Sequence, residues 1–155
     1  MGKVQVKGEG YEFRLLDLTD DDLRRSSELL RSIFGKRGRH LTERYLRWFY
    51  VDNPEGRAIA FNAYKGTELA AHGAGVPMRG LVRGQPVTGL VFVNAVVAVG
   101  HRGRGVQGTV CDHTMAEAAR RGHSFCFVAG NKQSTKRLVT RFKPIAPLEA
   151  LPPAA

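Results

Sequence analysis

The sequence has few cysteines and no long apolar run, and both absences narrow the class of protein. No stretch approaches the roughly 18 to 20 apolar residues that a membrane span requires, and the charged N-terminus has no apolar segment of signal-peptide length. The two cysteines, Cys111 and Cys126, lie in apolar segments typical of buried reduced thiols. We therefore expect a cytoplasmic protein that does not enter a membrane. The five histidines are not closely paired, so no metal site is expected.

Acidic residues are also scarce relative to basic ones. The chain has 24 Lys plus Arg against 14 Asp plus Glu, a formal net charge of +10. This excess favours polyanionic partners such as nucleic acid, an anionic membrane surface or a phosphorylated ligand. The basic residues are spread along the chain without a run of five, which is equally typical of a generally basic, solubilising surface. A length of 155 residues with 43% hydrophobic residues indicates one globular domain.

Apolar spacing and helix-capping residues predict the order β, α, α, β, β, β, α, β, α. Thr19 and Thr42 precede helical patterns as N-caps, and Lys65-Gly66 and Arg83-Gly84 are hairpin turns. The aromatic residues of the second helix are expected in the core. The expected strands are 11–18, 58–64, 69–78, 90–99 and 124–129. Of these, 90–99 is nearly continuously apolar, as a strand buried on both faces must be, and it predicts the sheet centre.

The segment 94–113 runs from this strand through a glycine-rich basic turn into a helix. Gly103 and Gly105 let the backbone curl so that its N–H groups point into one concavity, and the helix that follows offers its positive dipole end. Arg102 and Arg104 add two positive charges that suit a pyrophosphate. The alternative is an ordinary strand-to-helix connection with solvated arginines.

In this turn, and in element order from about Tyr11 to Phe142, the sequence resembles the GNAT superfamily of acyl-CoA-dependent N-acetyltransferases. The resemblance implies an α+β fold with a mixed, mostly antiparallel sheet flanked by helices, and acetyl-CoA as cofactor. It also implies that backbone groups of Val97 and Val99 bind the pantetheine arm, and that Asn131 helps hold the cofactor, although Asn131 can equally be a plain helix cap. The residues implied at the pyrophosphate are Arg102, Gly103, Arg104, Gly105, Val106 and Gln107. Gln107 departs from the family's Gly or Ala.

Two further segments resemble one branch of the GNAT superfamily. Residues 47–50 with 53–56, and later 130–134, look like a bacterial branch described as polysaccharide-biosynthesis or uncharacterised acetyltransferases.

The family generally ends in two more strands after the last helix, so the resemblance implies a shortened C-terminal end for this chain. A shortened fold, a partner chain at the open edge, as in a homodimer, or a fragment of a longer protein would each explain this. The expected division is 1–10 as leader or short edge strand, 11–143 as the GNAT-like domain and 144–155 as a Pro/Ala-rich tail.

The groups that acyl transfer needs are only partly visible. Many relatives carry an acidic base on the central strand, where this chain offers Asn94, and a tyrosine acid early in the last helix, where Thr135 follows Ser134. Ser134 or Thr135 can orient a water, and His72 has an ordinary pKa suited to accepting a proton. These three are the candidate catalytic residues.

Three functions follow in order of support. The first is an acetyl-CoA-dependent N-acetyltransferase acting on a small-molecule amine acceptor, such as an amino sugar or nucleotide sugar. The second is a catalytically weak or inactive CoA-binding or interaction module, favoured by the missing acid and base. The third is binding of nucleic acid through the basic surface, which ranks last because no reading motif is present.

Overall fold

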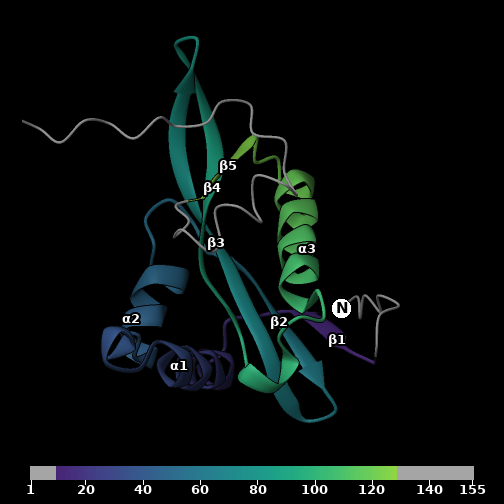
Figure 1. The fold of residues 1–155 in the computed structure, drawn as a ribbon. Helices are drawn as coiled ribbons and strands as arrows, with labels where there is room; N and C mark the ends of the chain where they lie inside the picture. The colour runs from purple at the N-terminus through teal and green to yellow at the C-terminus, as the bar shows by residue number, and fades with distance from the viewer. Residues whose placement is uncertain (1–9, 129–155) are drawn as a thin grey trace, which may run out of the picture.

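The fold is a five-stranded sheet with helices on both faces. The computed structural model describes residues 10–128, and the strand order is β1-β2-β3-β4-β5. Helices α1 and α2 lie on one side of the sheet and α3 on the other (Figure 1). The strands are β1 (Glu12–Leu15), β2 (Ile59–Lys65), β3 (Glu68–Val82), β4 (Gln85–Val97) and β5 (Phe125–Val128). The helices are α1 (Asp20–Phe34), α2 (Glu43–Leu46) and α3 (Val106–Arg120). Short helical turns η1 (Gly35–Gly38), η2 (Arg47–Val51) and η3 (Val99–His101) complete the order.

Hairpins make most of the sheet antiparallel. The strands β1 to β4 pair antiparallel in sequence order, and β4 pairs parallel with β5 because α3 carries the chain across the sheet. The β3–β4 hairpin extends well past the partners of either strand and projects from the body of the molecule (Figure 1). Its tip is the predicted turn, where Arg83 and Gly84 both have positive φ, 50° and 77°, as a two-residue type I′ loop requires.

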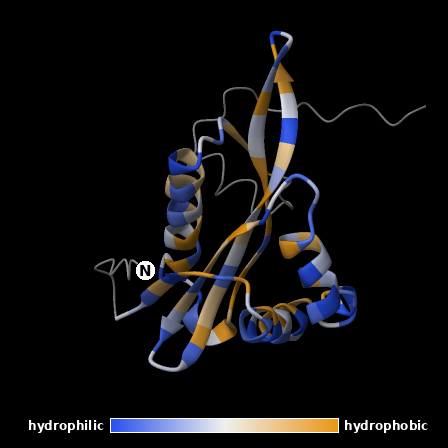
Figure 2. Ribbon diagram, turned by 180° about the vertical axis from the view of Figure 1, so that it is seen from behind, coloured by the Kyte–Doolittle hydropathy of each residue, from blue (hydrophilic) through white to orange (hydrophobic). Residues whose placement is uncertain are grey.

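The two faces of the sheet carry separate cores. On one face Leu23, Leu30 and Leu46 of α1 and α2 pack with buried residues that include Ala74 and Val96. On the other face Val106, Val110 and Ala118 of α3 pack with a second set from β2, β3 and β4. Apolar and polar residues accordingly alternate along the helices in Figure 2. Burying one stripe of each helix against the sheet is what the predicted helical spacing requires.

The capping residues form as predicted. The Thr19 hydroxyl accepts from the backbone N–H of Asp22 at 3.2 Å, and the Asp22 carboxylate accepts from the Thr19 N–H at 3.0 Å, which is a full capping box. The Thr42 hydroxyl accepts from the Tyr45 N–H. Within residues 10–128, no helix combines the length and the apolar character needed to cross a bilayer.

The structure corrects three expectations about elements. The expected strand 90–99 begins earlier, at Gln85, and ends at Val97, because Val99 enters the tight turn η3, closed by the His101 N–H bonding the Ala98 carbonyl at 2.9 Å. The strand is also not buried on both faces, since Ala95 is exposed. The second helix is not one α-helix, because after Leu46 it widens into the π-helix η2. The expected last helix and the tail 144–155 lie outside the described residues.

Candidate functional site

The glycine-rich turn leads into the N-terminus of α3 with no side-chain cap. Gly105 is the N-cap residue, with φ of 75°, and it has no side chain to cap the first N–H groups of the helix. Gly103 has φ of 76°, and a Cβ added at either glycine would meet no atom within 4 Å. The turn is therefore open on its outer side. Uncapped N–H groups at the positive end of a 15-residue helix suit an anionic group such as a diphosphate.

Gln107, the departure from the family turn, lies inward rather than across the turn. Both polar atoms of its carboxamide are buried without a hydrogen-bond partner in the structure. Its Nε2 would be 3.4 Å from a Cβ at Gly73, and Phe92 and Val110 would each be 3.0 Å from that Cβ. Gly73 thus leaves the room that Gln107 occupies between β3 and α3. Because the Gln107 side chain points inward, it leaves the outer side of the turn clear for an anionic ligand at the start of α3.

The strand end that precedes the turn separates the two residues expected to bind pantetheine. Val97 is the last residue of β4 and is half-buried, and its carbonyl accepts from Arg102 Nε at 3.4 Å. Val99 lies past the strand end in η3, with 71% of its surface exposed. Of the two residues expected to bind the pantetheine arm, only Val97 therefore has backbone groups that belong to the strand.

A β-bulge interrupts β4 just before this end. Ala74 pairs with Val93 and His72 with Val96, so that Asn94 and Ala95 together oppose the single residue Gly73. Asn94 adopts φ of 56°, a left-handed conformation that asparagine tolerates better than most residues. The bulge interrupts regular strand pairing next to the strand end that leads into the turn.

Buried polar side chains connect the bulge to the interior. Asn94 Nδ2 donates to the Tyr50 hydroxyl at 2.7 Å, and that hydroxyl lies 3.1 Å from His72 Nε2. His72 Nδ1 lies 2.7 Å from Asn62 Oδ1, and Asn62 Nδ2 donates to the Tyr64 hydroxyl at 3.2 Å. Tyr50, His72 and Asn62 are fully buried. We call Asn94, Tyr50, His72 and Asn62 the polar relay.

Burial sets the ionisation state of His72. Burial lowers the pKa of His72 from 6.5 to about 3, because a charged imidazole would lose its hydration with no carboxylate beside it. Burial likewise raises the pKa of Tyr50 well above its ordinary value. His72 is therefore neutral at physiological pH. Its side chain has no exposed surface and contacts the η2 tyrosine rather than the turn.

A second histidine anchors the turn to the body of the protein. His101, in η3, is buried, and its Nδ1 lies 2.7 Å from the Tyr11 hydroxyl. Its Nε2 lies 3.2 Å from a carboxylate oxygen of Glu68, which is exposed at the start of β3. These contacts hold the residues just before Arg102 against β3 and the segment ahead of β1.

The structure brings together part of the predicted site. Val97 ends β4 and residues 102–105 are exposed in the turn before α3, whereas Val106 is buried and His72 lies inside the relay. Asn131, Ser134 and Thr135 lie outside the described residues. Sequence reasoning missed Asn62 and Tyr50. The available signal for Asn62 was a polar residue within the apolar strand 58–64, and the hairpin at Lys65-Gly66 places it opposite His72.

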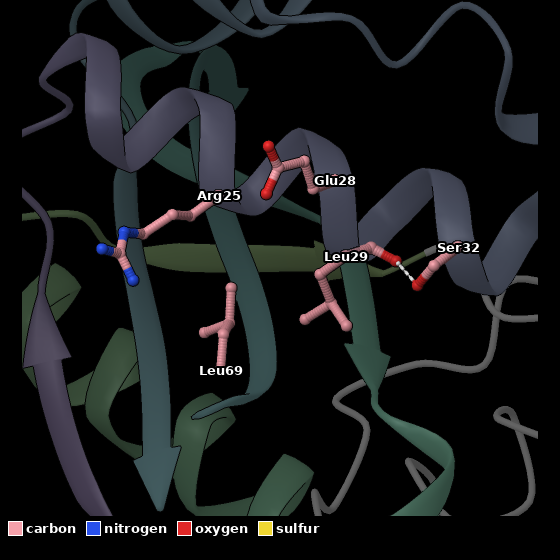
Figure 3. Close-up of a pocket in the computed structure, with 5 residues that line it drawn as sticks. All are labelled: Arg25, Glu28, Leu29, Ser32 and Leu69. Atoms are coloured by element: carbon pink, nitrogen blue, oxygen red, sulfur yellow. Dashed lines mark hydrogen bonds between the residues drawn. The ribbon is translucent and has the colours of Figure 1, made fainter. Parts of the chain in front are cut away.

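Surface hollows near α1 and α2 contain none of the predicted site residues. One lies between α1 and the start of β3, lined by Arg25, Glu28, Leu29, Ser32 and Leu69 (Figure 3), where the Ser32 hydroxyl donates to the Leu29 carbonyl. Another is lined by Thr42, Arg44, Tyr45 and Trp48. The expectation that the second helix's aromatics are core is wrong for Trp48, which is 59% exposed because the widened turn η2 carries it outward.

Two cysteines that form no disulfide complete the inventory of reactive groups within residues 10–128. Cys111 is buried and Cys126 is half-buried, and both are unbridged. Burial raises the pKa of Cys126 to about 11, so this thiol is poorly nucleophilic at neutral pH. Among residues 10–128, no three His, Cys, Asp or Glu side chains lie together as metal ligands would.

The fold is α+β, with a mixed sheet flanked by helices, in which the bulged strand β4 lies beside the central strand β3 and leads into α3. The comparisons with known proteins identify its family. Residues 14–136 match the family model described as an acetyltransferase (GNAT) domain. The chain therefore belongs to the GNAT acetyltransferase family, whose members use acetyl-CoA. No curated protein matches the sequence.

Solved structures share this fold at low sequence identity. A predicted acetyltransferase with acetyl-CoA from Clostridium acetobutylicum is 12% identical, with a TM-score of 0.73, covering 94% of this chain and 96% of that one. Glucosamine-6-phosphate N-acetyltransferase from Arabidopsis thaliana is 14% identical, with a TM-score of 0.67 and coverages of 93% and 98%. An aminoglycoside acetyltransferase from an uncultured soil metagenomic sample, in complex with sisomicin, is 12% identical, with a TM-score of 0.69 and coverages of 94% and 95%.

Proposed function

We propose that the protein transfers an acetyl group from acetyl-CoA to the amine of a small acceptor. The observation that carries this proposal is the open turn at Gly103 and Gly105 before the uncapped start of α3. There the helix N–H groups and the guanidinium groups of Arg102 and Arg104 would hold the diphosphate of coenzyme A. Acetyl-CoA, when bound, supplies the thioester carbonyl that the amine attacks. The backbone groups of Val97 and Gln107 are those proposed to bind the rest of the cofactor.

The proposed acceptor is an amino sugar or a nucleotide sugar. Support comes from the branch resemblance at residues 47–50 and 53–56, and from the glucosamine-6-phosphate and aminoglycoside acetyltransferases that share the fold. The net charge of +10 favours an anionic acceptor such as a phosphorylated amino sugar over a polycation. The hollow lined by Trp48 and Arg44 offers an aromatic face that can pack against a sugar ring and a guanidinium group that can bind its phosphate.

A CoA-binding module without transferase activity is the second candidate. Asn94 favours it, because a carboxamide stands on the strand where many relatives carry an acidic base. His72 favours it too, since a fully buried imidazole with a pKa of about 3 is a weak base at neutral pH. Both candidates require cofactor binding, and they differ only in whether an amine is acetylated.

Cofactor binding is tested by calorimetric titration with acetyl-CoA on three forms of the protein. Gly105→Asp places a carboxylate where the diphosphate is expected, so we predict at least about a tenfold loss of affinity. Gly84→Asp is the matched control, because Gly84 has φ of 77° and equally open surroundings, but lies at the hairpin tip. Equal binding by the two variants would show that the cofactor does not lie at this turn.

Turnover is tested by thiol release from acetyl-CoA with glucosamine 6-phosphate and with sisomicin as acceptors. The transferase proposal expects amine-dependent release, with preference for the phosphorylated sugar. Tight acetyl-CoA binding with no release by either amine would favour the non-catalytic module. The raised pKa of Cys126 keeps this thiol slow toward the detection reagent.

Location and assembly complete the proposal. The two free thiols support a reducing, cytoplasmic environment. A homodimer is supported by the outer edge of β3, which β2 pairs only up to Gly75, and by exposed Leu81 and Val82 near the hairpin tip. A second copy pairing along this open edge would cover both residues.

A further inference from the structure

Two backbone irregularities, far apart in the sequence, meet at one hydrogen bond. The π-helix η2 carries Tyr50, and the β-bulge of β4 carries Asn94 in a left-handed conformation. The 2.7 Å contact between Asn94 Nδ2 and the Tyr50 hydroxyl joins them. Each irregularity costs free energy relative to a regular helix or strand, and such features concentrate at ligand-binding and active sites.

The hydrogen bonds of the relay run in one direction. Asn62 uses Nδ2 as a donor to Tyr64, so its Oδ1 faces His72 and must accept from Nδ1–H. His72 Nε2 then has no proton and accepts from the Tyr50 hydroxyl. The Tyr50 oxygen therefore presents only lone pairs toward Asn94, and Asn94 must offer its NH₂.

The direction of the relay fixes which end of Asn94 is left for a ligand. Its nitrogen faces Tyr50, so its oxygen is the remaining group, and among the described residues no donor bonds that oxygen. Asn94 is only half-buried, unlike the three residues behind it, and lies on the strand that leads to the proposed cofactor turn. The site therefore presents a hydrogen-bond acceptor of neutral charge.

We propose that Asn94 binds the acceptor amine through its carboxamide oxygen, and that Tyr50, His72 and Asn62 are positioning residues that keep this oxygen facing the amine. This inference rests on the proposed acetyl transfer. A neutral primary amine donates N–H to the oxygen while its lone pair remains available to attack. A carboxylate or phosphate group has only acceptor oxygens, which would repel the carboxamide oxygen of Asn94. Asn94 therefore favours the amine end of the acceptor over its anionic end.

The chemistry of a carboxamide also decides where the proton goes. The amine nitrogen bonds the acetyl carbon, the carbon–sulfur bond breaks, and the sulfur leaves as thiolate. Asn94 is not a base, so the proton released by nitrogen passes to solvent water, and the thiolate takes its proton from water. The pH profile of kcat/KM should then follow the pKa of the acceptor amine, with no ionisation from His72, whose pKa is about 3.

The test compares Asn94→Gly, Tyr50→Phe and Thr114→Val with the wild type. Glycine adopts positive φ freely, so Asn94→Gly removes the carboxamide without straining the bulge. We expect it to raise the KM for glucosamine 6-phosphate by about tenfold, the loss of one hydrogen bond, with acetyl-CoA affinity unchanged. Tyr50→Phe should give a smaller rise, because Asn94 is then free to flip. Thr114→Val is the control, since it also removes a buried hydroxyl, one that donates to the Val110 carbonyl within α3 and lies outside the relay and the proposed binding surfaces.

A second readout separates positioning from simple structural support. Ring-nitrogen NMR should show His72 protonated at Nδ1 between pH 5 and 8 in the wild type, and a changed Nε2 signal in Tyr50→Phe but not in Thr114→Val. An unchanged KM in Asn94→Gly, or an Nε2–H tautomer of His72, would overturn the inference alone. An inactive wild type with every amine would overturn the proposed function, and this inference with it.

Discussion

His72 links the stability of the protein to pH. Its pKa is about 3 in the folded protein and about 6.5 when the chain is unfolded. Between these values the imidazole is protonated in the unfolded state and neutral in the native state. Between these two values, stability is lost as the pH falls. Above about pH 6.5 the imidazole is neutral in both states and makes no difference.

We predict that the free energy of unfolding falls by about 1.4 kcal/mol per pH unit as the pH drops below 6. Urea titrations at pH 7, 6 and 5 measure the slope. His72→Gln removes the ionising group, so the slope of its unfolding free energy against pH should be smaller by that amount. His113 and His123, whose pKa values burial also lowers, remain in both proteins and contribute equally. Identical slopes would show that His72 is protonated in the native state.

Gly89 is a position where packing forbids a side chain. A Cβ there would lie 2.6 Å from the ring of Phe125, which covers the base of the hairpin on β5. We expect Gly89→Ala to lower the free energy of unfolding by about 1 to 3 kcal/mol, because the aromatic ring must move. Gly100→Ala is the matched control, with no atom within 4 Å and ordinary φ, and should change stability by less than about 0.5 kcal/mol. Chemical denaturation distinguishes the two.

At the scale of elements, the entry of α1 depends on a cap rather than on packing alone. The reciprocal bonds between Thr19 and Asp22 satisfy N–H groups that the first turn leaves unpaired. α1 in turn covers one face of the sheet and supplies Leu23 and Leu30 to the core around the relay. The cap therefore contributes to the stability with which α1 packs on that face of the sheet.

Replacing Thr19 by alanine should cost about 1 kcal/mol of unfolding free energy. Thr67→Ala serves as the comparison, because Thr67 is exposed in the turn between β2 and β3. Guanidinium denaturation of both variants measures the difference. A loss of equal size at Thr67 would mean that threonine propensity, and not the cap, is responsible.

At the scale of the whole molecule, the outer end of the β3–β4 hairpin exposes apolar side chains. Leu81 is 75% exposed and Val82 55% exposed, and two strands alone are marginally stable in water. Association of two copies along the open edge of β3 would bury these residues. The short edge strand β1, with Leu15 38% exposed, is the competing edge.

Sedimentation velocity is predicted to show a dimer for the wild type and a monomer for the double variant Leu81→Lys with Val82→Lys, because two charges oppose burial. Leu15→Lys should remain dimeric. Dissociation by Leu15→Lys alone would place the interface at β1. A monomeric wild type at every concentration would rule out the dimer.

The sequence by itself determined the order of the elements within residues 10–128, both threonine caps, the hairpin turns and the position of the glycine-rich turn. These features depend on residues close together in the chain, such as Thr19 with Asp22, or Gly103 and Gly105 before α3. Local chemistry limits the backbone there, so the pattern is readable without tertiary contacts.

Only the tertiary structure decided the rest. That Tyr50, His72, Asn62 and Asn94 form one relay depends on where η2 packs against the sheet, and on a bulge that shifts the register of β4 by one residue. The same packing buries His72 and carries Trp48 to the surface. Burial and long-range hydrogen bonding are properties of the assembled layers, and a one-residue shift in register moves side chains between faces.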